Sequence, residues 1–239
     1  MRLIGVGVGP GDPELVTVKA ARVLSTAGRV FVPVLPSGDI GRAEATVRAH
    51  AAHDRVERLV FALNERHDHS RRERCWDAAG ERVAKWLRET GGTAAFATIG
   101  DPNVYSTFGY LAETVRGLVP EVGVESIPGI TAMQALASAA GTPLVEGRES
   151  LTLLPLAHGV DERLPAALDG DGTVVIYKGG RHLAGVSEAV KAAGREAYFG
   201  SHLGLPAERV AWLSEVDGEA PYLATVIAPP RRAYRGGKL

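Results

Sequence analysis

The chain has 239 residues, enough for one large domain or two smaller ones with substantial cores. Its formal net charge of -1 argues against general nucleic-acid binding, because such proteins usually present a basic face. The single cysteine, Cys75, excludes an intramolecular disulfide and is typical of a reducing cytoplasm. Neither a signal peptide nor an apolar stretch of membrane-spanning length is recognisable, so we expect a cytoplasmic protein without nucleic-acid or membrane partners.

The first predicted strand, residues 3–8, is apolar on both faces, as in a buried parallel sheet. It runs into the glycine-rich turn Gly9-Pro10-Gly11, which has the look of a dinucleotide-binding loop. Counted from Gly5, however, Pro10 stands where the third glycine of G-x-G-x-x-G belongs. A nicotinamide oxidoreductase is therefore a disfavoured alternative.

Strands and helices then alternate. Further strands are predicted over residues 30–34, 56–61, 93–98 and 122–127, and helices over residues 17–24, 42–50, 76–87 and 107–118. A last helix of this half begins near Thr131. This pattern predicts five parallel strand-helix units.

The most polar stretch, residues 64–74, contains His67, His69 and several arginines. With His50 and His53 these histidines offer metal ligands, but their spacing matches no zinc pattern. The arginines offer partners for substrate carboxylates. We interpret the stretch as a solvated loop and predict no metal site.

A Gly-Asp-Pro turn, Gly100-Asp101-Pro102, joins a predicted strand to the helix over residues 107–118. In open parallel sheets, ligands bind at such turns, beyond the carboxyl ends of the strands. Gly100 permits close approach of a ligand, and Asp101 can cap a helix or accept a ligand's hydrogen bond. Pro102 suits a first helical turn. A capped strand-helix junction without a ligand is the alternative interpretation.

A second turn of this kind ends the strand over residues 122–127. Thr131 and Gln134 have the spacing of a capping box. The turn either caps a helix or presents free backbone N–H groups on the same side as Asp101.

From Leu151 the pattern changes to short strands, some separated by helices such as the one predicted over residues 183–193. The strands are expected over residues 151–156, 173–177, 196–200, 210–213 and 222–227. We predict a two-domain α/β protein, with a five-stranded parallel sheet in residues 1–130 and a mixed sheet with helices in residues 131–239. The default ligand site is a cleft between the domains. The basic last nine residues are expected to be loose.

Three motifs together resemble the tetrapyrrole (corrin and porphyrin) methyltransferases. They are residues 6–17 (VGVGPGDPELVT), Gly100-Asp101-Pro102 followed by Tyr105, and residues 127–132 (IPGITA). Their order and spacing agree with the family, and the resemblance runs from Leu3 to about Ile227. Thr98 and Ile99 depart from the family pattern, which more often has a small or acidic residue and a second glycine before Gly100.

Within this family, the likeness is to the subgroup that methylates carbon 20 of precorrin-2. The residues that suggest it are 105–111 (YSTFGYL), 151–155 (LTLLP) and 177–183 (YKGGRHL). Whether the substrate is metal-free or carries cobalt is left open.

The resemblance implies a homodimer that binds S-adenosylmethionine in the interdomain cleft and leaves S-adenosylhomocysteine. The residues it implies for this cofactor are Gly100, Asp101, Val104, Tyr105, Ser106, Thr131, Ala132, Tyr177, Ala224 and Thr225. Those expected to face the tetrapyrrole are Pro10, Gly11, Asp12, Lys178 and Arg181. For Lys178 and Arg181 the alternative is that they are ordinary surface charges after a strand. The base that removes the carbon-20 proton is open between Tyr105, Asp101 and a solvent chain.

Two further alternatives remain at this point. One is methylation of another position, as in uroporphyrinogen-III or precorrin-4 methyltransferases. The other is a non-catalytic corrinoid- or nucleotide-binding module. His182 and His202 could sense a metal, although ordinary surface or hydrogen-bonding roles are favoured.

Overall fold

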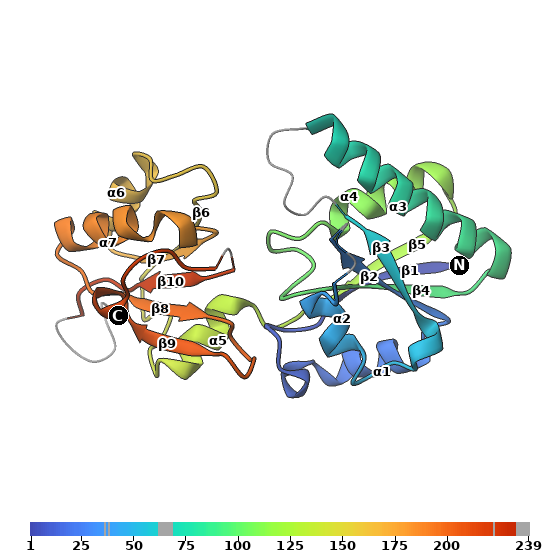
Figure 1. Cartoon of the computed structure of the whole chain (residues 1–239), viewed down its shortest axis with the longest axis horizontal. Coiled ribbons are helices and arrows are strands. Elements are labelled where there is room, and N and C mark those ends of the chain that lie inside the picture. Colours follow the sequence, from blue (N-terminus) through green and yellow to red (C-terminus); the bar gives the residue numbers. More distant parts are fainter. Residues whose placement is uncertain (36, 38, 62–68, 222, 233–239) are drawn as a thin grey trace. The chain divides into compact units, whose positions relative to one another are not determined.

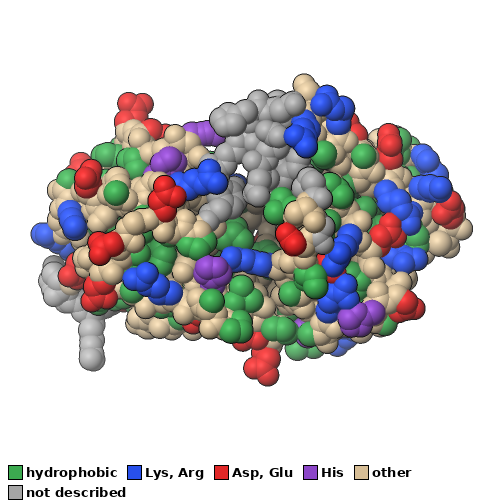
Figure 2. Space-filling model, in the orientation of Figure 1, with side chains coloured by type: hydrophobic (Ala, Val, Ile, Leu, Met, Phe, Trp, Pro, Cys, Tyr) green, Lys and Arg blue, Asp and Glu red, His purple; other side chains and the backbone are tan. Residues whose placement is uncertain are grey.

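The computed structural model describes residues 1–35, 37, 39–61, 69–221 and 223–232. The chain divides into two compact units, Met1–Thr131 and Ala132–Leu239 (Figure 1). Among the described residues, no helix combines the length and apolarity needed to cross a bilayer. On the face drawn in Figure 2, basic and acidic side chains are interspersed on the surface.

The N-terminal unit contains five parallel strands in the order β3-β2-β4-β1-β5. These are β1 (Arg2–Gly7), β2 (Arg29–Val34), β3 (Val56–Val60), β4 (Thr93–Thr98) and β5 (Gly123–Ile127). The prediction of a five-stranded parallel sheet is thus confirmed. Because β4, β1 and β5 are neighbours, the loops that follow them lie at one edge of the sheet.

Helices cover both faces of this sheet (Figure 1). They are α1 (Val18–Thr26), α2 (Arg42–Val47), α3 (His69–Thr90) and α4 (Phe108–Leu118). Leu3 and Phe96 belong to the core under α3 and α4, whereas Ile4 and Ala95 belong to the core under α1 and α2. Alternate residues of a strand point to opposite faces, which explains why β1 is apolar throughout.

The C-terminal unit has a mixed sheet in the order β6-β7-β10-β8-β9, in which only β6 and β7 pair in parallel. Its strands are β6 (Leu151–Pro155), β7 (Thr173–Tyr177), β8 (Tyr198–Ser201), β9 (Arg209–Trp212) and β10 (Thr225–Ala228). Its helices are α5 (Ala132–Ala139), α6 (Arg163–Leu168) and α7 (Leu183–Ala192). The mixed sheet is as predicted.

Two details of this unit differ from the sequence prediction. The strand expected over residues 222–227 is observed over Thr225–Ala228, and the Ala224 N–H before it donates to the Pro221 carbonyl. Residue 222 lies outside the described residues. The six-residue α6 was not predicted, since so short a segment shows little periodicity.

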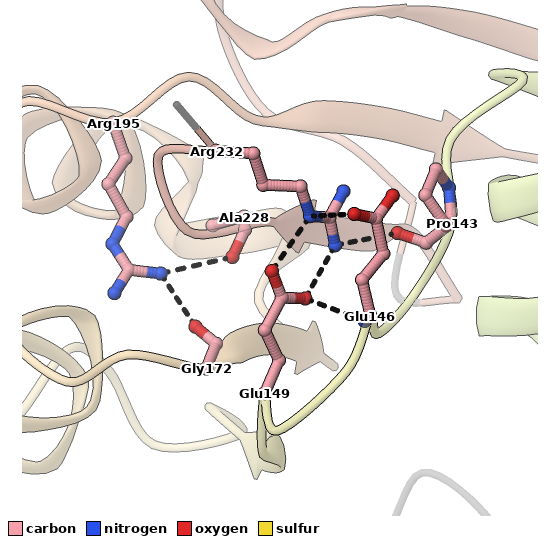
Figure 3. A network of polar contacts seen from close by, with 7 residues as sticks. All are labelled: Pro143, Glu146, Glu149, Gly172, Arg195, Ala228 and Arg232. Atoms are coloured by element: carbon pink, nitrogen blue, oxygen red, sulfur yellow. Dashed lines mark hydrogen bonds and ion pairs between the residues drawn. The ribbon is translucent and has the colours of Figure 1, made fainter. Parts of the chain in front are cut away.

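The start of the basic tail is fixed, which corrects the expectation that all nine residues are loose. Arg232 donates to both carboxylate oxygens of Glu149, at 2.9 and 2.8 Å, and to the Pro143 carbonyl (Figure 3). Arg231 donates to the Gly194 carbonyl at 2.6 Å. Residues 233–239 lie outside the described part of the chain.

Buried Arg195 joins other backbone segments of the same unit (Figure 3). It donates to the carbonyls of Gly170, Gly172 and Ala228. Burial lowers the pKa of Arg195, against a smaller opposing effect from Asp171 and Asp169. The carbonyls replace the water that this guanidinium loses on burial.

We expect Glu149→Gln to lower the unfolding free energy of the C-terminal unit by about 1–3 kcal/mol at neutral pH, because it breaks a charge-assisted pair. The hydrogen bond from Arg232 lowers the pKa of Glu149. The stabilisation is therefore complete above the unfolded-state pKa of about 4.3 and is lost as the pH falls through the lower folded-state value. Urea unfolding at neutral and acid pH, with hydrogen exchange at β10, measures both effects.

The matched control is Asp161→Asn, which removes the exposed ion pair with Arg163. We expect no measurable change from it. Equal losses from both substitutions would contradict the assigned role of Glu149.

Candidate functional site

The loops after β1, β4 and β5 meet through their backbones. The Gly100 N–H donates to the Gly9 carbonyl at 2.8 Å, and the Val8 N–H donates to the Thr98 carbonyl at 2.9 Å. A Cβ added to Gly7 would lie 2.6 Å from both the Gly100 carbonyl oxygen and the Gly129 nitrogen. We call Gly7, Gly100 and Gly129 the glycine junction.

At Gly7 and Gly129, any side chain would overlap backbone atoms of the neighbouring loops. A Cβ on Gly129 would lie 2.1 Å from the Gly100 carbonyl oxygen and 2.8 Å from the Gly7 backbone. Gly100 itself has a φ of 71° and would bring a Cβ within 3.9 Å of the Thr131 Cα. The junction therefore places Gly100 beside Thr131, the pair expected from the sequence at one ligand site.

Asp101 joins the β4 and β5 loops. One carboxylate oxygen accepts from the Asn103 N–H at 2.8 Å, and the other accepts from the Gly129 N–H at 3.0 Å. The suggestion that Asp101 and Pro102 open the following helix is wrong, because α4 begins only at Phe108. Asp101 instead closes its own turn and ties it to the neighbouring loop.

Ser106 bonds the first residue of α4 through its side chain, whereas the N-cap residue Thr107 makes no side-chain cap bond. The Ser106 hydroxyl accepts from the Phe108 N–H at 3.1 Å and donates to the Thr98 hydroxyl at 3.2 Å. Between Asp101 and Ser106, Val104 donates its N–H to the Asp101 carbonyl. Tyr105 has a φ of 50° and is 44% exposed. Backbone strain at a non-glycine residue is concentrated at functional sites, so Tyr105 is a strong candidate.

The loop after β1 is bonded by Thr46 of α2 and lies against His50 of the turn that follows α2. The Thr46 hydroxyl donates to the Gly11 carbonyl at 3.1 Å, and His50 Nε2 lies 3.0 Å from the Pro13 carbonyl oxygen. Asp12 accepts from the Glu14 N–H at 2.8 Å and caps the 3-10 turn Pro13–Leu15. Within this unit Pro10 and Gly11 are buried, and Asp12 is partly exposed.

In the C-terminal unit, one edge of the sheet collects Tyr177, Thr225 and the start of α5. Tyr177 and Gly200 pair with Thr225 on either side of β10. The Met133 N–H donates to the Tyr177 hydroxyl at 3.3 Å, which places that ring at the N-terminal end of α5, next to Ala132. The buried Thr225 hydroxyl has no hydrogen-bond partner within the described chain.

Two more strained residues flank this edge. Lys178, after β7, has a φ of 61°, and His202, after β8, has a φ of 52°. Since β7 and β8 both run antiparallel to β10, their carboxyl ends lie on either side of Ala224 and Thr225. Lys178 is partly buried and Arg181 is exposed in the 3-10 turn Gly180–His182.

The structure thus gathers the predicted residues into two groups, one in each unit. The first group comprises Gly100, Asp101, Val104, Tyr105, Ser106 and Thr131, with the loop of Pro10, Gly11 and Asp12 adjoining through Gly9. The second comprises Ala132, Tyr177, Lys178, Arg181, Ala224 and Thr225. The interdomain cleft stays a prediction.

The motifs contain Gly7 and Gly129 but do not reveal their close contact, and for His202 the sequence suggests only metal sensing or an ordinary surface or hydrogen-bonding role. The Pro-Gly pair before Thr131 was the available signal for Gly129. A left-handed histidine has no sequence signal. Within the described chain no group of three or more His, Cys, Asp or Glu side chains is arranged to hold a metal, and residues 64–68 of the polar stretch lie outside it.

Comparison with known proteins adds the family context. The model of the family Tetrapyrrole (Corrin/Porphyrin) Methylases matches residues 2–216. A precorrin-2 C(20)-methyltransferase of Sinorhizobium sp is 36% identical over 238 residues, covering 95% of each chain. A probable cobalt-precorrin-2 C(20)-methyltransferase of Methanocaldococcus jannaschii is 37% identical over 177 residues, 74% of this chain and 72% of the relative.

A solved structure shares the fold. Uroporphyrin-III C-methyl transferase from Thermus thermophilus, complexed with S-adenosylhomocysteine, superposes with a TM-score of 0.65 at 21% identity. The match covers 95% of this chain and 97% of that one. The two-unit α/β architecture is therefore a known arrangement.

We expect Gly129→Ala to destabilise the N-terminal unit by about 1–3 kcal/mol, because the new methyl group overlaps two backbones. Urea unfolding, with hydrogen exchange at β4 and β5, measures the loss. The control is Gly109→Ala in α4, where a Cβ meets nothing within 4 Å. It should stabilise the protein by roughly 0.5–1 kcal/mol. A neutral Gly129→Ala would refute the steric account of the junction.

Proposed function

Because the chain belongs to the tetrapyrrole (corrin/porphyrin) methylase family, we propose that it methylates carbon 20 of precorrin-2 in cobalamin biosynthesis, with S-adenosylmethionine as donor. The observation that carries this proposal is the 36% identity, over 95% of both chains, to a precorrin-2 C(20)-methyltransferase. The motif of residues 105–111 points the same way. Dimerisation and a cytoplasmic location stay predictions.

When bound, S-adenosylmethionine supplies an activated methyl group: the bond to carbon 20 forms as the sulfur–carbon bond breaks, and a proton leaves carbon 20. The protein's contribution is to position the reactants, which can supply roughly 7–11 kcal/mol of the barrier, and to exclude water. The fixed glycine junction suits this task.

In the N-terminal unit, Asp101 has capacity for the donor. Each of its carboxylate oxygens accepts one backbone N–H, so further lone pairs remain for a ribose hydroxyl or an ammonium group. We assign Gly100, Val104, Tyr105 and Thr131 to the walls around it. The Ser106 hydroxyl already bonds Thr98 and Phe108, so we assign it to holding the loop.

In the C-terminal unit, the unpartnered Thr225 hydroxyl fits a polar atom of the donor. A buried hydroxyl without a partner is costly, so a ligand that bonds it gains affinity. We assign the adenosine end of the donor to Thr225, Ala224, Tyr177 and Ala132. Lys178 and Arg181 are assigned to the peripheral carboxylates of the tetrapyrrole, and Pro10, Gly11 and Asp12 to its ring.

A second candidate substrate is the cobalt complex of precorrin-2. The 37% identity to the relative named as a probable cobalt-precorrin-2 C(20)-methyltransferase favours it. The two substrates require the same methyl transfer, so they differ only in what occupies the centre of the ring.

The first test incubates the purified protein with S-adenosylmethionine and either metal-free or cobalt-loaded precorrin-2. We expect S-adenosylhomocysteine to form with one of them and NMR to place the new methyl on carbon 20. A methyl at another position would identify a sister reaction. If no tetrapyrrole yields S-adenosylhomocysteine, the proposal of an enzyme fails in favour of a binding module.

The second test replaces Thr225 by Val. We expect the free protein to keep its stability, because the buried hydroxyl bonds nothing, while the Kd for S-adenosylmethionine rises about five- to tenfold. Isothermal titration calorimetry measures the Kd, and thermal unfolding measures the stability.

Thr173→Val is the matched control, since Thr173 also buries an unpartnered hydroxyl but lies at the other end of β7. It should leave the Kd unchanged. Equal affinities for both variants would remove Thr225 from the donor site.

A further inference from the structure

Residues spaced four apart on α2 and in the turn after it contact the loop that follows β1 in the same order along the chain. Thr46 bonds the Gly11 carbonyl, and four residues later His50 reaches the Pro13 carbonyl. Arg42 precedes Thr46 by four residues and so lies on the same face, one turn earlier. If this register continues, we expect Arg42 to lie near Gly9 and Pro10, at the start of the loop.

The neighbouring acid of α2 is already neutralised by other arginines. Glu44 has no exposed surface, and its carboxylate accepts hydrogen bonds from Arg48 and, at 2.8 Å, from Arg58. Burial raises the pKa of Glu44, but the bonds from Arg58 and Arg48 together outweigh it, so the net shift is downward. Glu44 is thus ionised and shared by two guanidinium groups.

Unlike Arg48 and Arg58, Arg42 does not bond Glu44. It is partly buried, and within the described chain its guanidinium makes no hydrogen bond or ion pair. Burial lowers the pKa of Arg42. A partly desolvated guanidinium without an anion is unfavourable, and its planar fork matches a carboxylate.

We propose that Arg42 binds one peripheral carboxylate of the tetrapyrrole that lies against the Gly9-Pro10-Gly11 loop, and so fixes how the ring is rotated in the site. The inference rests on the proposed function for the identity of the carboxylate. It adds to Lys178 and Arg181 a cation on the N-terminal unit. Through Arg42, the N-terminal unit would recognise the substrate by a carboxylate as well as by its ring.

The test compares the wild type with Arg42→Gln, Arg42→Lys and Arg22→Gln. Arg22 is an exposed arginine of α1, so its variant matches the change in charge. The first measurement is the affinity for uroporphyrin III, a carboxylate-bearing porphyrin, by fluorescence quenching without S-adenosylmethionine. The second is KM and kcat for precorrin-2, and the third is the Kd for S-adenosylmethionine.

We expect Arg42→Gln to weaken porphyrin binding and raise KM by about 10- to 100-fold, with kcat changed less than about threefold. Arg42→Lys should recover part of the affinity, because charge remains but the fork is lost. Arg22→Gln should match the wild type, and no variant should change the Kd for S-adenosylmethionine.

Unchanged porphyrin affinity and KM in Arg42→Gln would overturn the inference while leaving the proposed methyl transfer intact. If the wild type binds the porphyrin through Arg42 but methylates no tetrapyrrole, the proposed function fails and the inference stands. Thermal unfolding checks that each variant is folded. If Arg42→Gln does not fold, the inference is tested with Arg42→Lys. A wild-type affinity of that variant for uroporphyrin III would overturn the bidentate contact.

Discussion

The close approach of three backbones at the glycine junction is the constraint on which the N-terminal site depends. Parallel strands bring the ends of β4, β1 and β5 to one edge, but side chains would normally keep their loops apart. Glycine at positions 7 and 129 removes that obstacle. Asp101 then locks the contact by accepting one N–H from each of two loops. The loop that follows is held firmly enough to keep Tyr105 in a strained conformation.

In the C-terminal unit, the edge of the sheet combines a hydroxyl that has a hydrogen-bond partner, that of Tyr177, with one that has none among the described residues, that of Thr225. Strand ends on both sides of β10 carry left-handed Lys178 and His202, while the Tyr177 hydroxyl is occupied by the first turn of α5. The buried Thr225 hydroxyl lies between these strand ends and has no hydrogen bond within the described part of the chain. A ligand that bonds this hydroxyl would gain affinity, because the group has already lost its water in the free protein.

Arginines of this protein illustrate how context sets the role of one residue type. Arg195 is satisfied by backbone carbonyls, and Arg232 holds the chain end to Glu149. Arg48 and Arg58 share one buried carboxylate. Arg42 differs from them, because it is partly buried and has no anion among the described residues.

The sequence by itself determined the alternation of elements, the parallel and mixed sheets, and the three motifs of the family, because period, turn residues and motif spacing are local properties. Only the tertiary structure decided that Asp101 bonds Gly129 and does not cap the helix that follows its own loop. Gly129 is 28 residues away in the sequence. Likewise, the pairing of Arg232 with Glu149 and the unbonded state of Thr225 depend on which strands become neighbours. Hydrogen bonds between distant segments, and the lack of one at a buried hydroxyl, follow from three-dimensional packing and leave no pattern in the residue order.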